Sequence, residues 1–131
     1  MASLFSKIVK GEIPCYKIAE TEDHLAFLDV FPLAKGHALV IPKKETDYIF
    51  DMEDKEFSQL QLFSKKVARA IEKVIPCKRI GVAVIGLEIP HAHIHLIPLS
   101  NVSDINFSGP KLNLSKEELE ETAKKIREQL S

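Results

Sequence analysis

Three histidines alternate with apolar residues in one short stretch of the chain: His91, His93 and His95. The stretch 91–99 has the composition of a β-strand, in which successive side chains point to opposite faces. The three imidazoles then share one face, with about 7 Å between successive same-face positions, so they can converge on a small group such as a phosphate. An unperturbed imidazole titrates at about pH 6.5, so at neutral pH one ring can be a nucleophile while a protonated neighbour stabilises oxyanion charge.

Two kinds of chemistry stay open for this row of rings. Three imidazoles and a water would form a catalytic zinc site that generates hydroxide near neutral pH. Alternatively, the rings act without a metal, one as a nucleophile and its neighbours as phosphate ligands. Surface histidines without a function are a third interpretation, but three of the five histidines in the chain fall at alternate positions of one strand, which favours a functional site.

The elements that position this strand follow from the hydrophobic periodicity of the remaining sequence. We expect helices over 4–9, over 53–75 and from a capping box formed by Ser115 and Glu118 to the C-terminal end. We expect strands over 16–19, 25–30, 37–41, 79–86 and 91–99, of which 79–86 is buried on both faces. This order predicts an α+β fold, a five-stranded, mainly antiparallel sheet with one long central helix, a short N-terminal helix and a C-terminal helix.

Length, composition and charge limit the kinds of partner. The chain has 131 residues, 45% of them hydrophobic, so residues 1–131 are expected to form a single domain with 111–131 as a C-terminal helical extension. A net charge of -1 gives no basic excess for nucleic acid, and neither a secretory signal nor a membrane span is found. Cys15 and Cys77 lack metal-type spacing and are expected to be reduced thiols in a cytoplasmic protein. A small molecule or a protein is the expected partner.

The sequence from His91 to Ile97 fits the pattern His-φ-His-φ-His-φ-φ, where φ is apolar. Three further stretches, 4–14, 26–30 and 36–44, look like landmarks of the same family. On these residues the chain resembles the histidine triad family, in its branch that hydrolyses purine nucleoside phosphoramidates. The resemblance covers residues 3–99 and implies a single domain of that family.

The resemblance implies a role for each residue of a nucleotide site. His93 would attack the α-phosphorus of the nucleotide, forming a nucleotidyl-histidine that water later cleaves, while a backbone carbonyl holds the other ring nitrogen. An acceptor-only carboxylate suits the ribose diol, and ring donors suit the phosphate. The expected residues are His91, His95, His37 and Gly86 for the phosphate, Asp29 for the ribose, and Phe5, Ile8, Phe27, Leu28 and Val30 for an apolar base pocket.

The sequence departs from the family pattern at two places. Before the triad, the phosphoramidate-hydrolysing members carry a loop that ends in Gly-Gln-Ser, whereas Leu87 and Glu88 stand here where Gln and Ser would be, which affects the leaving group and the rate. Many bacterial members begin with a Cys-x-x-Cys zinc pair, at whose positions this chain has Ser3 and Ser6. Because hydroxyls are poor replacements for thiolates, we expect no structural zinc and no cofactor.

The leading prediction is therefore a hydrolase of purine nucleoside phosphoramidates or related nucleotides. The resemblance also implies a homodimer joined through the long helix and the fourth strand, and it implies neither a nucleic-acid nor a membrane partner. Two alternatives stay open: a metal-dependent hydrolase that uses the three histidines as ligands, and a non-catalytic nucleotide-binding module, which the altered loop at Leu87 and Glu88 would suit.

Overall fold

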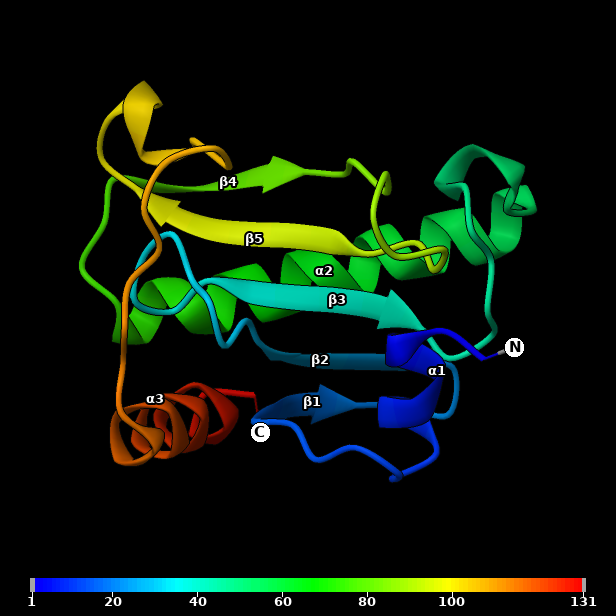
Figure 1. Cartoon of the computed structure of the whole chain (residues 1–131), viewed down its shortest axis with the longest axis horizontal. Coiled ribbons are helices and arrows are strands. Elements are labelled where there is room, and N and C mark those ends of the chain that lie inside the picture. The colour runs from blue at the N-terminus through cyan, green and yellow to red at the C-terminus, as the bar shows by residue number, and fades with distance from the viewer. Residues whose placement is uncertain (1, 131) are drawn as a thin grey trace.

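The computed structural model describes residues 2–130, and one five-stranded sheet forms its centre (Figure 1). Neighbouring strands are all antiparallel, in the spatial order β1-β2-β3-β5-β4. The strands are β1 (Lys17–Glu20), β2 (His24–Leu28), β3 (Ala38–Pro42), β4 (Arg79–Ala83) and β5 (Ile94–Leu99); the helices are α1 (Leu4–Val9), α2 (Asp54–Val74) and α3 (Lys116–Glu128), with two short 3-10 helices, η1 (Ile49–Asp51) and η2 (Val102–Asp104). The predicted α+β fold is confirmed, while residues 1 and 131 of the predicted domain lie outside the described residues.

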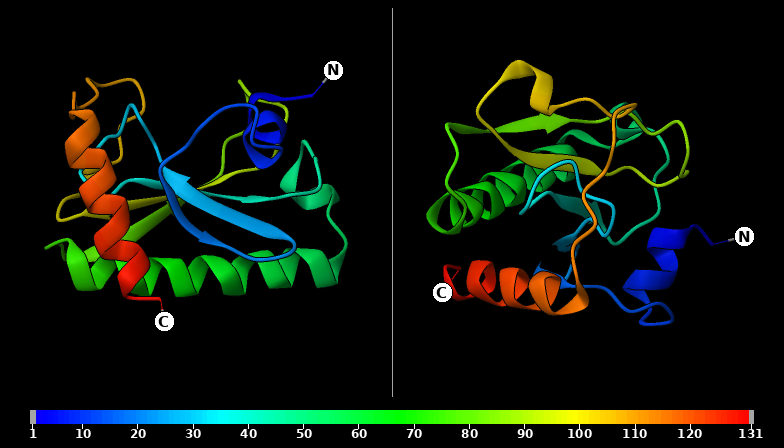
Figure 2. Two further views of the ribbon diagram at one scale, coloured as in Figure 1. Left: turned by 90° about the horizontal axis from the view of Figure 1, so that it is seen from below. Right: turned by 60° about the vertical axis from the view of Figure 1, so that its left-hand side comes forward.

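The main core lies between the sheet and α2, which runs along one face of it (Figure 2). Leu60, Val67 and Ile71 recur at helical spacing on α2 and are fully buried against strand residues such as Val40 and Ile94. Within residues 2–130, no helix is both long and apolar enough to cross a membrane. The C-terminal helix joins the same core through Leu119, Ala123 and Ile126.

The opposite face of the sheet carries α1 and a second, smaller apolar cluster (Figure 2). Phe5 of α1 packs there against Phe27 and Leu39, which alternate with main-core residues along β2 and β3. Ser3 caps α1 by accepting a hydrogen bond from the Ser6 N–H. Leu39 is paired with His95 in the β3–β5 ladder, so the histidine side chain shares this second face.

Two strand predictions differ from the structure. The fourth strand ends at Ala83, and it is the edge of the sheet rather than buried on both faces, with Val82 60% exposed. Runs of Ile and Val occur both in buried strands and in edge strands that form interfaces. The composition of this strand therefore did not determine its position in the sheet. The fifth strand begins at Ile94, and His91 and His93 precede it.

Candidate active site

His93 lies immediately before β5, and the backbone of His91, two positions earlier, holds its ring. Its Nδ1 donates to the His91 carbonyl oxygen over 2.8 Å. A neutral imidazole carries one proton, so the Nε2 atom of His93 keeps its lone pair. The Phe5 ring stands edge-on against the His93 ring, with centroids 4.9 Å apart, and fixes its other side. This arrangement supplies an oriented nitrogen nucleophile.

His95 points to the same face as His93, with ring centroids 5.1 Å apart, and is oriented by His37. The Leu33 backbone N–H donates to His37 Nδ1 over 3.0 Å, so the proton of neutral His37 is on Nε2. That Nε2–H donates to His95 Nδ1 over 3.0 Å. Neutral His95 therefore carries its own proton on Nε2 and can donate it to an anion. One backbone amide thus sets the tautomer of both rings.

Burial keeps this pair of rings neutral. Desolvation, with a smaller contribution from a neighbouring histidine, lowers the pKa of His37 to about 3 and that of His95 to about 4. Both rings are therefore uncharged at neutral pH, which agrees with the hydrogen bond between them. Desolvation also raises the pKa of the Asp29 carboxyl, against smaller opposing effects of the Phe31 N–H and His93.

His91 differs from the expectation that it contacts phosphate. Its side chain is fully buried, and both ring nitrogens face protein atoms: Nε2 donates to the Pro42 carbonyl oxygen over 2.7 Å, and Nδ1 lies 3.0 Å from the Ser3 hydroxyl. No ring nitrogen is left for a ligand. Of the three triad rings, those of His93 and His95 are left to contact a phosphate. His91 faces the site with its carbonyl oxygen.

This geometry also bears on the metal alternatives. In a metal site made of the three triad rings, His91 could not act as a ligand, because both of its ring nitrogens are hydrogen-bonded. Among residues 2–130, Asp29, His37 and His95 do offer one ligand atom each within 4.8 Å of one another. A metal there would have to displace the proton that His37 holds on Nε2, since its Nδ1 already accepts the Leu33 N–H. The donor set thus suits a hydrogen-bonded pair better than a cation.

The residues expected to form a base pocket separate into two groups. Phe5 and Phe27 pack edge to face with centroids 5.7 Å apart, and Ile8 packs against their cluster. Val30, just beyond β2, is 46% exposed and free to contact a ligand. Leu28 is a correction: it alternates with Phe27 along β2 and therefore packs in the main core on the other face.

Asp29 directly follows β2, near the histidine pair. Its Oδ2 lies 3.6 Å from His37 Nε2, while its Oδ1 accepts the Phe31 N–H over 2.8 Å. Its side chain is partly exposed, so lone pairs of a carboxylate remain available to a diol.

The loop between β4 and the triad contains the residues that depart from the family pattern. Gly86 has a φ of 72°, a backbone conformation that favours glycine. Leu87 is 89% exposed, and Glu88 is exposed beside it. None of these residues contacts a histidine ring through a described interaction, so the phosphate role of Gly86 stays a prediction.

Sequence reasoning missed two parts of the site. The segment after η2 crosses the histidine face of the sheet on its way to α3 (Figure 1), and Phe107 there stands edge-on to the His95 ring, with centroids 4.8 Å apart. Lys111 ties the same segment together by donating to the Phe107 carbonyl oxygen. The second part is Glu45, which hydrogen-bonds to Ser3 and Ser6. Nothing local in the sequence connects these residues with the histidines, because the contacts span many positions.

Fold and site together define an α+β protein in which the hydrogen-bonded His93 ring lies beside a second ring, His95, that can donate a hydrogen bond. Residues 10–102 match the HIT domain family. The adenosine 5'-monophosphoramidase hnt1 of Schizosaccharomyces pombe is 38% identical over 134 residues, which covers 97% of this chain and 100% of that protein. The chain therefore belongs to the HIT domain family, as the histidine pattern predicted.

Solved structures agree with this assignment. A HIT-like protein involved in cell-cycle regulation from Bartonella henselae superposes with a TM-score of 0.84 at 32% identity, covering 98% of this chain and 96% of that one. A Zn-bound histidine triad family protein from Mycobacterium smegmatis gives a TM-score of 0.83 at 26% identity, covering 99% and 94%. In the present chain, Ser3 and Ser6 offer hydroxyls that are already hydrogen-bonded to Glu45 and His91, a donor set that does not fit structural zinc.

Proposed function

We propose that the chain is a nucleotide-binding hydrolase that cleaves purine nucleoside 5'-phosphoramidates or related nucleotidyl substrates through a covalent nucleotidyl-His93 intermediate. The observation that carries the proposal is the hydrogen bond from His93 Nδ1 to the His91 carbonyl oxygen, because it leaves Nε2 unprotonated and aimed beside the His95 ring. The named activity of the fission yeast relative supports the same substrate class.

The proposed reaction has two displacements at the α-phosphorus. His93 Nε2 attacks, the bond from phosphorus to the leaving amine breaks, and the amine takes a proton from solvent. His95, whose Nε2 carries a proton, donates to a phosphoryl oxygen as negative charge builds on it. Water then attacks the phosphorus and releases a proton to solvent, the bond to His93 breaks with its electron pair returning to Nε2, and a nucleoside monophosphate leaves with the ring neutral again.

Substrate recognition in this proposal uses both ends of the site. Asp29 accepts hydrogen bonds from the ribose hydroxyls, and Gly86 adds a backbone donor near the phosphate. Phe5 and Phe27, with Ile8 and Val30 beside them, provide an apolar surface for the purine. In this proposal His91 contributes its carbonyl oxygen to the nucleophile and His37 acts on the phosphate through His95.

The decisive experiment replaces the nucleophile. In His93→Ala, kcat for an adenosine phosphoramidate should fall by at least about 10⁴-fold, because the covalent route is lost, while adenosine monophosphate still binds. Intact-protein mass spectrometry of a quenched reaction should show one nucleotidyl group on the wild-type chain and none on the variant. Undiminished turnover in His93→Ala would refute the proposal.

A second candidate is a non-catalytic nucleotide-binding module, which the exposed Leu87 and Glu88 favour because they replace polar leaving-group contacts. Phosphoramidates, adenylylsulfate and dinucleoside polyphosphates should be screened together. Binding of adenosine monophosphate without an adduct from any of them would establish the module and not the hydrolase.

We also propose that the chain forms a homodimer through α2 and β4. The edge strand offers unpaired backbone groups and the exposed Val82, and the exposed Val84 lies just beyond its end. A groove between α2 and β4, lined by residues that include Ala68 and Ile80, continues this surface. An exposed edge strand with apolar side chains is a template for pairing with another chain, which favours an interface here.

A further inference from the structure

The anchor of the proposed nucleophile lies outside the sheet. The β3–β5 ladder begins at the pair Val40 and Ile94, so His91 and His93 have no strand partner. Outside the regular strands and helices of residues 2–130, two backbone bonds hold this stretch: His91 N–H to the Ile89 carbonyl and Ala92 N–H to the Thr46 carbonyl. The His91 carbonyl that orients His93 must therefore be fixed largely by the His91 side chain.

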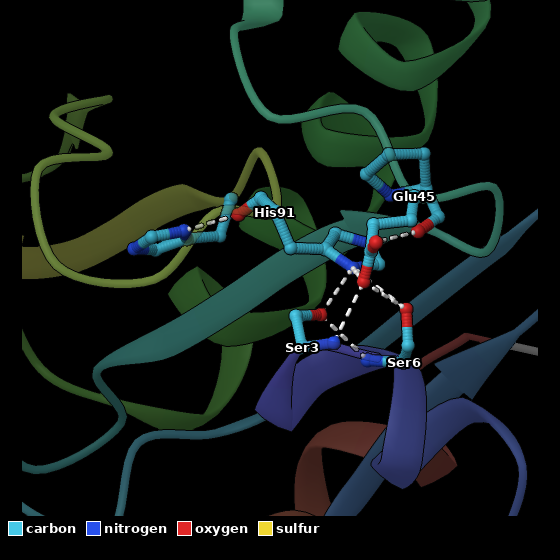
Figure 3. Close-up of polar contacts among 6 residues, drawn as sticks. Ser3, Ser6, Glu45 and His91 are labelled. Carbon is cyan, nitrogen blue, oxygen red and sulfur yellow. Dashed lines mark hydrogen bonds and ion pairs between the residues drawn. The ribbon is translucent and has the colours of Figure 1, made fainter. Parts of the chain in front are cut away.

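A compact polar cluster surrounds that side chain (Figure 3). The Ser3 hydroxyl lies 3.0 Å and the Ser6 hydroxyl 3.3 Å from His91 Nδ1. Glu45 Oε1 accepts two hydrogen bonds, from the Ser3 N–H over 2.8 Å and from the Ser6 hydroxyl over 2.7 Å. The cluster joins the start of α1, the segment after β3 and the triad, which are 39 to 88 positions apart in the chain.

The hydrogen bonds leave one consistent placement of protons. His91 Nε2 carries its proton, because it faces the Pro42 carbonyl at 2.7 Å, so Nδ1 of the neutral ring must accept. The Ser6 hydroxyl gives its proton to Glu45, which leaves the Ser3 hydroxyl as the donor to His91. Burial lowers the pKa of His91, which agrees with a neutral ring. The Ser6 N–H completes the cluster by donating to the Ser3 oxygen.

We infer that Ser3, Ser6 and Glu45 form a metal-free clamp, in which Glu45 is a positioning residue that fixes His91 and thereby the Nδ1–H tautomer and direction of His93. Glu45 holds Ser3 and Ser6, Ser3 holds the His91 ring, and the His91 carbonyl holds His93. The clamp stands at the two positions where the resemblance implies zinc-binding cysteines in many bacterial members. The effect of the clamp on catalysis rests on the proposed function. The effect of the clamp on the tautomer and direction of His93 does not.

Two substitutions of Glu45 separate the acceptor from its charge. Glu45→Ala removes the acceptor of both serine bonds and should lower kcat about 10- to 100-fold, as loss of an orienting partner does, with KM for the nucleotide changed less than about 2-fold. Glu45→Gln keeps an oxygen at the Oε1 position and should restore kcat to within about 3-fold of wild type. Glu20→Ala is the matched control, since Glu20 is also a surface carboxylate but is paired with Lys17 and Lys43 and not with Ser3 or Ser6.

A spectroscopic measurement tests the clamp independently of turnover. Imidazole ¹⁵N–¹H correlation spectra of the full-length protein should show His93 as the Nδ1–H tautomer in wild type, Glu45→Gln and Glu20→Ala, and as a mixture of tautomers in Glu45→Ala. Thermal unfolding of each variant shows whether the fold is kept. If wild type proves inactive but the His93 spectra change as stated, the hydrolase proposal fails and the clamp stands. Unchanged His93 signals and kcat in Glu45→Ala, or equal losses in Glu45→Ala and Glu45→Gln, would overturn it.

Discussion

At the scale of single residues, backbone atoms decide which nitrogen of each histidine can react. The Leu33 N–H directs the proton of His37 towards His95, and the His91 carbonyl directs that of His93 away from the site. Two chemically identical rings, His93 and His95, thus receive opposite properties, one a free lone pair and the other a free proton. In the proposed reaction, histidine therefore supplies both the nucleophile, His93, and the hydrogen-bond donor to the phosphate, His95, because the hydrogen-bond partners of the two rings differ.

His95 is expected to act on charge that develops during the reaction. His95→Ala should lower kcat for the phosphoramidate about 10²- to 10³-fold, the usual effect of removing one preorganised donor to an oxyanion. Steady-state kinetics at pH 7 measures it. His24→Ala is the control, because His24 lies on β2 and stacks on Phe63 of α2, on the other face of the sheet. A loss confined to KM would show that His95 binds the ground state only.

At the scale of secondary structure, local patterns were sufficient for most elements. The hydrophobic periodicity over 4–9 and 53–75 predicted α1 and α2 within a residue, since this signal lies inside the element itself. The position of β4 at the sheet edge was not predictable, because strand order depends on contacts far apart in the sequence. Glu45 and Phe107 were missed for the same reason: each reaches the histidines only through the tertiary fold.

The edge position of β4 gives the dimer proposal its test. Val82→Asp places a charge on the exposed edge and should convert a dimer, of twice 14.7 kDa, into a monomer, because a charge at an apolar contact must be desolvated. Light scattering coupled to size exclusion measures the mass. Val102→Asp, at a valine that is 93% exposed on η2, is the matched control and should leave the mass unchanged. A monomeric wild type would remove the proposal.

At the scale of the whole molecule, the site lies where three remote segments meet on one face of the sheet. These are the triad with β3, the N-terminal helix with Phe5, and the segment after η2 with Phe107. The His-φ-His-φ-His pattern was sufficient to predict the family, because its signal is local. The assembly of the site around the triad was not predictable, since contacting residues such as Ser3 and His91 are 88 positions apart in the sequence.

The same assembly makes the stability of the fold depend on pH. His37 and His95 have pKa values of about 3 and about 4 when folded, against about 6.5 in an unfolded chain. On acidification the unfolded chain therefore takes up protons first, so stability is fully present above pH ~6.5 and is lost as the pH falls towards the folded values. Linkage gives a loss of about 2 kcal/mol for each ring between pH 7 and pH 5, as an upper value.

Urea denaturation at pH 7 and pH 5 measures this loss, and His37→Asn isolates the share of one ring. The window lies above the ordinary pKa of glutamate, so the strongly lowered pKa values of Glu20 and Glu45 contribute little within it. The raised pKa of Asp29 changes the pH dependence of stability in the opposite direction, and it does so equally in wild type and in His37→Asn. His37→Asn should lose about 1–2 kcal/mol less than wild type between the two pH values. An equal loss in both would mean that His37 is not held neutral by burial in the folded protein.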